Sequence, residues 1–310
     1  MTLYAWGRPR RFPHLPPAEE RLFEVEPGTR VLAHCHWQES PERHPVLIGL
    51  HGLESSSGAH YMRGLADKAW CAGFNVLLLN QRNCGGTESL ADTLYHSGLT
   101  GDADRVIDEI VRRDGIRKVV VAGYSLGGNL ALKLAGDHGR DAPPALAGVC
   151  AVSPVMELDE CVRALERRQN VVYQWNFVRG LKARMRRKAA CQPGRYPLEP
   201  LRRIRTVRAF DDVYTAPHFG FRDAADYYHR ASAMRVIDRI RVPALIISAE
   251  DDPFVPPAPF RDPRVAANPH IRLILTRHGG HCGFVSAPVN GYDGYWAESR
   301  IVAFATDVGR

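Results

Sequence analysis

The stretch KVVVAGYSLGGNLALKLAG, residues 118–136, places a serine between glycines at the junction of a predicted strand and a predicted helix. Residues 119–122, after Lys118, are apolar and mostly β-branched, which is typical of a strand covered on both faces. In a nucleophile elbow, G-x-S-x-G forms a sharp turn that lifts the serine hydroxyl above the sheet edge, in front of a helix N-terminus. Gly123 and Gly127 would allow the turn, and Gly128 the close approach of the helix. Ser125 is therefore our candidate nucleophile.

The alternative interpretation of this stretch is an ordinary glycine-rich βα loop. A serine hydroxyl is a poor nucleophile by itself, so the nucleophile interpretation requires a base, and a group that orients the base, elsewhere in the chain. A phosphate-binding loop is not predicted, because no G-K-[ST] follows the glycines.

The composition is that of an ordinary globular protein, with 45% hydrophobic and 24% charged residues among 310. No run of 18 apolar residues occurs, so no transmembrane helix is predicted. The first 20 residues are basic and proline-rich and lack the apolar centre of a secretory signal. The seven cysteines form no C-x-x-C pair. We therefore expect a cytoplasmic protein with reduced thiols.

Continuous apolar runs bounded by turn residues predict a largely parallel sheet. Helix-length segments separate most of these runs, such as residues 101–114 with Asp102 as the expected N-cap. Two further strands around Pro27-Gly28 are expected to form an antiparallel edge. Together these patterns predict an α/β fold with a mostly parallel, eight-stranded sheet and helices on both faces. The six continuous runs are residues 46–50, 75–79, 118–122, 146–152, 244–248 and 271–275.

One interval is too long for a simple connection. Roughly 90 residues separate the strand ending near Ser153 from the strand beginning near Pro243, where a βα connection needs far fewer. We predict a helical cap at 155–235, inserted between core segments 1–154 and 236–310 and lying over the sheet edge where ligands bind. An apolar stripe at helical spacing supports the first cap helix: Val171, Trp175, Val178, Leu181 and Met185.

The predicted cap also carries most of the excess positive charge. The net charge is +7, and the segment from Cys161 to Arg208 holds 14 Lys and Arg against Glu166 and Glu199. Such a block forms either a solvated helix face or an electrostatic docking surface, for example for an anionic lipid surface. Nucleic acid is not an expected partner, because aromatic side chains are sparse among these cations.

A base and an acid follow Ser125 in the chain order of α/β-hydrolases. His281 lies in TRHGGHCGF after the last predicted strand, and the two preceding glycines favour it over His278, which we interpret as structural. The acid lies in ISAEDDPFVP, after the preceding strand. One carboxylate there would hold the tautomer of the imidazole, and spacing does not separate Asp251 from Asp252.

Donors for an oxyanion are expected where another strand ends in His51-Gly52. The backbone N–H groups of Leu53 and Leu126 would converge on one substrate oxygen. The alternative is a plain strand-ending turn.

Two other groups of candidates have simpler interpretations. His34 and His36 fall on one face of a predicted strand, but no third ligand is evident, so no metal site is predicted. Cys282 beside His281 is interpreted as a small packed residue rather than a thiol nucleophile.

Five segments together resemble the YheT-like family of α/β-hydrolases, over residues 46–285. They are HGLESSSGAHYMRGLA, LNQRNCGGTE, YHSGLTGDADRVI, GYSLGGNLALK and FDDVYTAPHFGFRDAADYYHRAS. The resemblance implies a capped serine esterase or lipase that needs no cofactor. By position it assigns the nucleophile to Ser125, the base to His281 and the acid to Asp252, which precedes Pro253. The chain departs from the family pattern at Ser55, where a glycine is usual, and it lacks the N-terminal hydrophobic anchor of eukaryotic members.

The expected function is therefore hydrolysis of carboxylic esters through an acyl-enzyme, with short- to medium-chain acyl groups and lipid-like alcohols among the substrates. Two alternatives stay open at this point: acyl transfer to an alcohol on the same triad, and a non-catalytic binding protein with the same fold.

Overall fold

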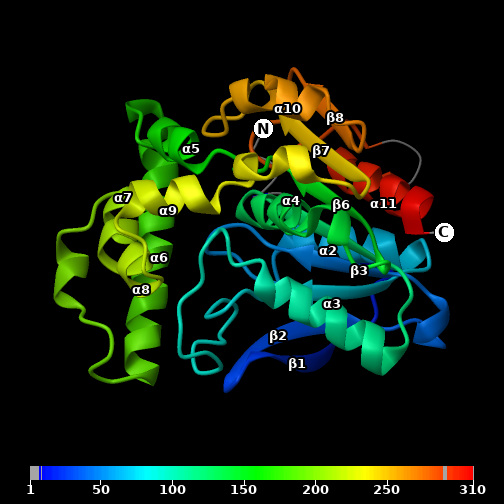
Figure 1. Cartoon of the computed structure of the whole chain (residues 1–310), viewed down its shortest axis with the longest axis horizontal. Coiled ribbons are helices and arrows are strands. Elements are labelled where there is room, and N and C mark those ends of the chain that lie inside the picture. The colour runs from blue at the N-terminus through cyan, green and yellow to red at the C-terminus, as the bar shows by residue number, and fades with distance from the viewer. Residues whose placement is uncertain (1–6, 8, 289–291, 310) are drawn as a thin grey trace.

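The computed structural model describes residue 7, residues 9–288 and residues 292–309. The chain forms one eight-stranded sheet in the order β1-β2-β4-β3-β5-β6-β7-β8 (Figure 1). Strand β2 pairs antiparallel with β1 and β4, whereas the pairs from β4 to β8 are all parallel. The predicted mostly parallel sheet is confirmed. The strands are β1 Glu19–Glu26, β2 Thr29–His36, β3 Val46–Leu50, β4 Asn75–Leu79, β5 Val119–Tyr124, β6 Leu146–Val152, β7 Ala244–Ala249 and β8 Ile271–Thr276.

The strands differ from the prediction mainly at one edge of the sheet. The inner strands β3 to β7 are buried almost throughout, as continuous apolar runs predict. Strand β8 is only partly buried, because it is the edge strand and pairs with β7 alone. The expectation that this run is covered on both faces was wrong.

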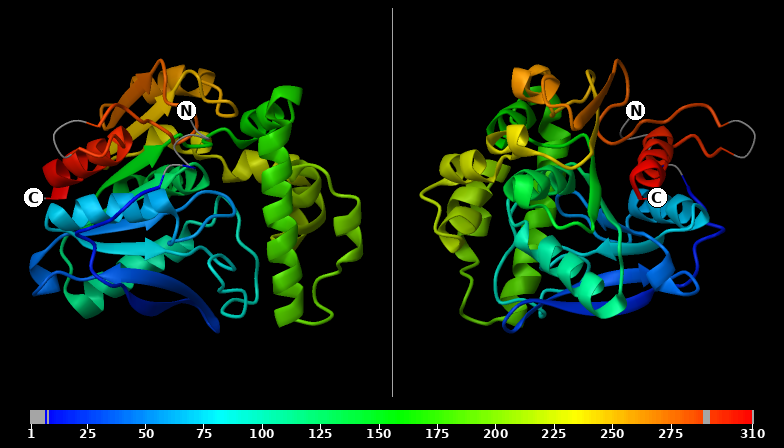
Figure 2. Two further views of the ribbon diagram at one scale, coloured as in Figure 1. Left: turned by 180° about the vertical axis from the view of Figure 1, so that it is seen from behind. Right: turned by 45° about the vertical axis from the view of Figure 1, so that its right-hand side comes forward.

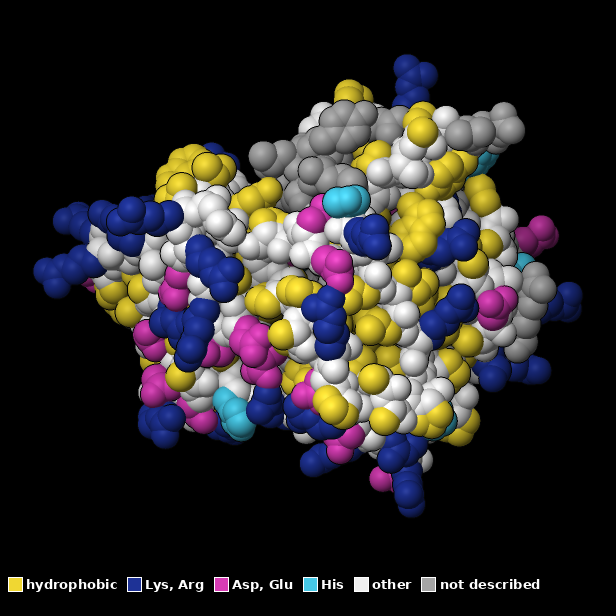
Figure 3. Space-filling model, turned by 90° about the horizontal axis from the view of Figure 1, so that it is seen from above, with side chains coloured by type: hydrophobic (Ala, Val, Ile, Leu, Met, Phe, Trp, Pro, Cys, Tyr) yellow, Lys and Arg dark blue, Asp and Glu magenta, His cyan; other side chains and the backbone are white. Residues whose placement is uncertain are grey.

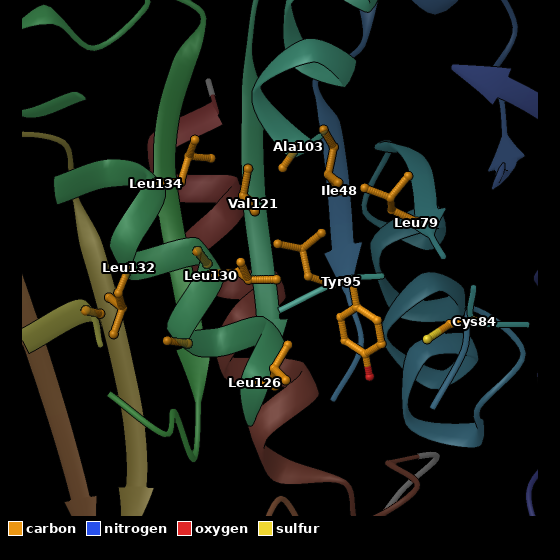
Figure 4. Packing of buried hydrophobic residues seen from close by; sticks show 14 of the residues in the cluster. Ile48, Leu79, Cys84, Tyr95, Ala103, Val121, Leu126, Leu130, Leu132 and Leu134 are labelled. Atoms are coloured by element: carbon orange, nitrogen blue, oxygen red, sulfur yellow. The ribbon is translucent and has the colours of Figure 1, made fainter. Parts of the chain in front are cut away.

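Helices cover both faces of the sheet (Figure 1). On one face α2 (His60–Cys71) packs with α11 (Trp296–Gly309), and on the other lie α3 (Gly101–Asp114) and α4 (Leu126–His138). Figure 4 shows the second layer, where Val121 of β5 and Ile48 of β3 face Leu130 of α4 and Ala103 of α3. The tightly packed β5–α4 unit therefore provides a rigid base for the turn that joins them.

The N-terminus of α3 differs from the prediction. Thr100 occupies the N-cap position, and Asp102 lies inside the first turn. The Asp102 carboxylate instead accepts a hydrogen bond from Nε of the buried Arg82 at 2.7 Å. The prediction of Asp102 as N-cap was wrong because this buried ion pair uses the side chain.

The long interval after β6 forms the cap helices, α5 to α9, which stand beside the sheet (Figures 1 and 2). They are α5 Leu158–Leu165, α6 Val171–Cys191, α7 Val207–Phe210, α8 Ala216–His218 and α9 Ala224–Ala231; α10 (Pro263–Ala266) follows β7. The domain boundaries 155 and 235 stay a prediction. Residues 1–6 and 8, on which the expectation about a secretory signal partly rests, lie outside the described residues.

The apolar stripe of α6 is buried only along part of the helix. Val178, Leu181 and Met185 are buried, but Val171 is 62% exposed and Trp175 is 60% exposed. The same two turns of α6 contact the core through other side chains: the rings of Tyr173 and Phe177 lie 5.3 and 5.8 Å from that of Phe254, centroid to centroid. Val171 and Trp175 are therefore on an uncovered side of these turns. Across the ranges that the structure describes, no helix is both long and apolar enough to cross a membrane.

Candidate active site

The turn between β5 and α4 holds Ser125 in a strained backbone conformation, with φ 55° and ψ −114°. Such values are costly for a residue with a Cβ and persist only where the surroundings enforce them. Here the Ser125 N–H donates to the Val152 carbonyl at 2.8 Å, which ties the turn to β6. A Cβ on Gly123 would lie 2.0 Å from the Gly127 carbonyl oxygen, and one on Gly127 would lie 2.2 Å from that of Leu50. Both positions therefore require glycine.

His281 and Asp252 meet in the interior beside this turn. Nδ1 of His281 lies 2.9 Å from Oδ2 of Asp252, and the two side chains are 3% and 0% exposed. The other oxygen of Asp252 accepts hydrogen bonds from the N–H groups of Phe254 (3.1 Å) and Val255 (3.0 Å). The Phe254 ring lies 4.1 Å from the imidazole, centroid to centroid. Asp252 is thus fixed in place, with one oxygen directed at the imidazole.

Asp251 makes different contacts, although it is adjacent in sequence. Its Oδ1 accepts hydrogen bonds from the N–H groups of Gly279 (2.8 Å) and Gly280 (2.7 Å). Its Oδ2 lies 3.4 Å from Nδ1 of the exposed His278. Asp251 therefore supports the turn that leads to His281, and the structural role of the exposed His278 stays a prediction.

Neighbouring groups favour the charged form of His281. Burial by itself opposes the imidazolium, but Cys282 and Asp252 favour it through charge and hydrogen bonds, and the balance raises the pKa of His281 above its ordinary value. The backbone N–H of Cys282 donates to Oγ of Ser153 at 3.1 Å, which fixes this part of the loop.

We expect kcat/KM for ester hydrolysis to rise with pH through an apparent pKa above about 6.5, the ordinary value for histidine. The reason is that the imidazole must be neutral to accept a proton. Replacing Cys282 by Ala removes one of the groups that raise the pKa of His281, so the midpoint should move to lower pH. The measurement is the pH profile of kcat/KM for both proteins. A midpoint below that of ordinary histidine, or one that Cys282→Ala leaves unmoved, would contradict this prediction.

The strand β3 ends at the loop expected to provide one oxyanion donor. The Gly52 N–H donates to the Tyr61 hydroxyl at 3.1 Å, and the Glu54 N–H donates to the Tyr95 hydroxyl at 3.3 Å. The intervening Leu53 is therefore held between two anchored peptide groups. Leu126 is the first residue of α4, so its N–H has no acceptor within the helix.

His51 at the start of this loop is fully buried and structural. Its Nε2 accepts a hydrogen bond from the Gln81 N–H at 3.1 Å, and its Nδ1 lies 2.8 Å from the Gly52 carbonyl oxygen. Burial lowers the pKa of His51 to about 4, so the ring is neutral at pH 7 and Nδ1 can donate to Gly52.

Three further side chains position the loop, and the sequence assigned none of them this role. They are Tyr61, Tyr95 and Arg184, which lie in α2, a connecting loop and α6. Nε of Arg184 donates to Oε1 of Glu54 at 2.7 Å, and its guanidinium lies 4.8 Å from the centre of the Tyr95 ring. This ion pair is buried and joins the cap to the loop that contains Leu53. The sequence signal for Arg184 was weak, because this residue is one of many arginines in a basic helix.

Two cavities adjoin Ser125. The inner one, about 80 Å³, lies between the core and the cap and has mostly apolar walls, including Leu126 and Leu181. The outer one, about 590 Å³, is bordered by polar groups such as Ser55, Asn176 and Arg179, and by His281. Leu53, Ser125 and Phe177 line both cavities. Ser125 thus lies where a narrow, mostly apolar space meets a wider one with a mixed lining.

The imidazoles of His34 and His36 each contact a protein group that is not a typical metal ligand. Nδ1 of His34 lies 3.0 Å from Oγ of Ser57, and Nδ1 of His36 lies 2.9 Å from the Pro16 carbonyl oxygen. Within the described ranges, no three His, Cys, Asp or Glu side chains gather as metal ligands would.

The chain is similar to known proteins over most of its length. Residues 45–288 match the model of the family described as alpha/beta hydrolase fold. "Putative esterase YheT" of Escherichia coli K12 is 37% identical over 87% of this chain and 80% of its own, and "Medium-chain fatty acid ethyl ester synthase/esterase 2" of Saccharomyces cerevisiae is 28% identical over 91% and 66%.

Among solved structures, the Pyrococcus furiosus esterase Pf2001 superposes with a TM-score of 0.63 over 94% of this chain and 93% of its own. It is only 15% identical in sequence, so this likeness concerns the fold. The sheet order, the turn at Ser125 and the match to the family model agree: the chain belongs to the α/β-hydrolase family, in its YheT-like branch.

Proposed function

We propose that this protein is a serine hydrolase that cleaves carboxylic esters through an acyl-enzyme. The observation that carries the proposal is the buried contact of 2.9 Å between His281 and Asp252, together with a single cavity lined by both His281 and Ser125. A nucleophile, a base and a group that orients the base are the parts that acyl transfer by serine requires. No member of the triad is replaced, which favours turnover over a purely binding role.

In the proposed mechanism, Oγ of Ser125 attacks the carbonyl carbon of the ester while His281 accepts its proton. The N–H groups of Leu53 and Leu126 stabilise the negative charge on the carbonyl oxygen, and one such donor is worth about 3 kcal/mol in related chemistry. His281 then gives the proton to the leaving alcohol as the C–O bond breaks. Water, activated by the same imidazole, attacks the acyl-enzyme and releases the acid and Ser125.

The two cavities suggest which part of the substrate goes where. We assign the acyl chain to the inner cavity, because its walls are mostly apolar, and the alcohol and the attacking water to the outer cavity, because it is wider and is the one that His281 lines. A cavity of about 150 Å³ can hold benzene, so the inner cavity of about 80 Å³ fits a chain of about four carbons. Longer acyl groups require movement of the cap, and the proposed range is therefore short to medium.

The experiment that tests the function is hydrolysis of a p-nitrophenyl ester series by the whole chain. Two added methylenes should raise kcat/KM about 15-fold from acetate to butyrate, at ~0.8 kcal/mol each, and dodecanoate should fall about tenfold below butyrate. Leu181→Ala, in the cavity wall, should move the preference to longer chains, whereas Leu132→Ala, buried elsewhere, should leave the butyrate-to-octanoate ratio unchanged. A folded protein that hydrolyses no ester would overturn the proposal. A preference for dodecanoate would overturn the assignment of the inner cavity.

Acyl transfer to an alcohol is the second candidate. A relative is named as a synthase as well as an esterase, and the outer cavity has room for an alcohol at the acyl-enzyme. Adding ethanol to the butyrate assay separates the two outcomes. If the enzyme transfers the acyl group to ethanol, ethyl butyrate replaces part of the butyrate product. If it only hydrolyses the ester, butyrate is the sole acyl product.

A further inference from the structure

The basic block of the cap divides into two sets of side chains. One set faces the core: Arg184 pairs with Glu54, Arg187 pairs with Glu88, and Nζ of Lys188 donates to the Glu88 carbonyl at 2.9 Å. The second set points away from the core and, among the described residues, has no carboxylate within ion-pair distance. Its members beside α6 are Arg167 and Arg168 before the helix, and Arg179, Lys182 and Arg186 along it; Arg202, Arg203 and Arg205, which follow α6, also belong to it.

The second set is crowded with positive charge. Burial lowers the pKa of Lys182, and the positive charges of Arg205 and Arg186 lower it further. Figure 3 shows Lys and Arg side chains projecting at the left end of the molecule, on the side of the cap helices in Figure 1. Such a field favours an anionic partner.

Exposed apolar side chains accompany these cations. Val171, Val172 and Trp175 are each about three-fifths exposed, and they share one end of α6. The guanidinium of Arg179 lies 4.9 Å from the centre of the Trp175 ring. Exposed apolar residues that gather in this way mark interaction sites, and a tryptophan flanked by arginines suits a membrane–water interface.

This end of α6 also adjoins the outer cavity. Asn176, Arg179 and Gly180 line that cavity together with Ser125, and Trp175 directly precedes Asn176 in the helix. A surface bound here would bring ester-containing lipids to the entrance.

We propose that the exposed side of α6, together with Arg167 and Arg168 before it, forms a docking surface for an anionic phospholipid membrane. Val171, Val172 and Trp175 enter the interface, while Arg167, Arg168, Arg179, Lys182 and Arg186 contact the phosphate headgroups. Apolar insertion and attraction to anionic lipid together give stable but reversible binding to the membrane surface.

The test is flotation of the full chain carrying Ser125→Ala with vesicles of phosphatidylcholine, with or without phosphatidylglycerol. Because this protein cannot turn over substrate by the proposed mechanism, binding is measured independently of the proposed function. We expect flotation with the anionic vesicles only, and release at high salt. Val171→Ser, Val172→Ser and Trp175→Ser together should weaken binding at least about tenfold. Arg167→Glu and Arg168→Glu together should weaken it more than about 25-fold, because each lost cation costs ~5-fold and each added carboxylate repels the anionic surface.

Matched controls use exposed residues elsewhere. The controls are Leu22→Ser on β1, and Arg140→Glu combined with Arg272→Glu. They replace one exposed apolar side chain and two exposed arginines on other surfaces, and both proteins should bind like the parent. Thermal unfolding verifies that every variant is folded. The proposal is overturned by equal binding to neutral vesicles, by no binding, or by cap variants that bind as well as their controls. Self-association through α6 without vesicle binding would assign the surface to a second copy of the chain instead.

Discussion

Replacement of Ser125 by Ala is expected to lower kcat for p-nitrophenyl butyrate by about 10⁶-fold. Loss of the nucleophile in a serine triad removes the acyl-enzyme path entirely, so only catalysis by the oxyanion donors and by substrate positioning remains. The backbone at residue 125 keeps its hydrogen bond to Val152 in the variant, and alanine fills less space than serine, so the fold should persist.

A fluorophosphonate probe checks the same prediction without turnover. The wild-type protein should be modified once, on the peptide that contains Ser125, and Ser125→Ala should not react. Cys282→Ala provides the control, because a thiol beside the base is the other candidate nucleophile and this variant should label like wild type. Labelling of Ser125→Ala to the same extent would show that another residue reacts.

The sheet was predictable because its inner strands are buried on both faces and therefore appear as uninterrupted apolar runs. The runs at 46–50, 75–79 and 146–152 coincide with β3, β4 and β6. The predictions that were wrong concerned features that depend on residues distant in sequence. The exposure of β8 follows from its position at the edge, and the role of Asp102 follows from Arg82, which lies 20 residues earlier. A local sequence pattern contains neither the position of a strand in the sheet nor the partner of a side chain distant in sequence.

The same distinction applies to the candidate site. Ser125, His281 and the acidic pair each follow a strand, so the topology of a parallel sheet brings them to one edge. The hydroxyls of Tyr61 and Tyr95 and the guanidinium of Arg184 reach the oxyanion loop from other elements, through side-chain contacts that no local pattern encodes. Val171 and Trp175 satisfy a helical apolar period but lie beyond the core. Periodicity identifies a face of a helix but not whether anything covers it.

Asp252→Asn is expected to lower kcat by about 10⁴-fold, while Asp251→Asn should stay within about threefold of wild type. The difference follows from the backbone contacts of each side chain. Two N–H groups, of Phe254 and Val255, require an acceptor at Oδ1 of residue 252, so an asparagine must direct its NH₂ group at Nδ1 of His281. The imidazole is then forced to carry its proton on Nε2, the nitrogen that must accept the proton of Ser125.

At residue 251 the same substitution leaves the contacts in place. Asparagine Oδ1 can still accept from Gly279 and Gly280, and its NH₂ group faces the exposed ring of His278. Because both variants lose one negative charge in adjacent positions, the pair separates the effect of the tautomer from that of charge. The measurement is kcat for butyrate hydrolysis above the midpoint of the pH profile, with thermal unfolding to verify the fold. If Asp251→Asn were the more damaged enzyme, Asp251 would be the acid and the buried contact between Asp252 and His281 would be structural.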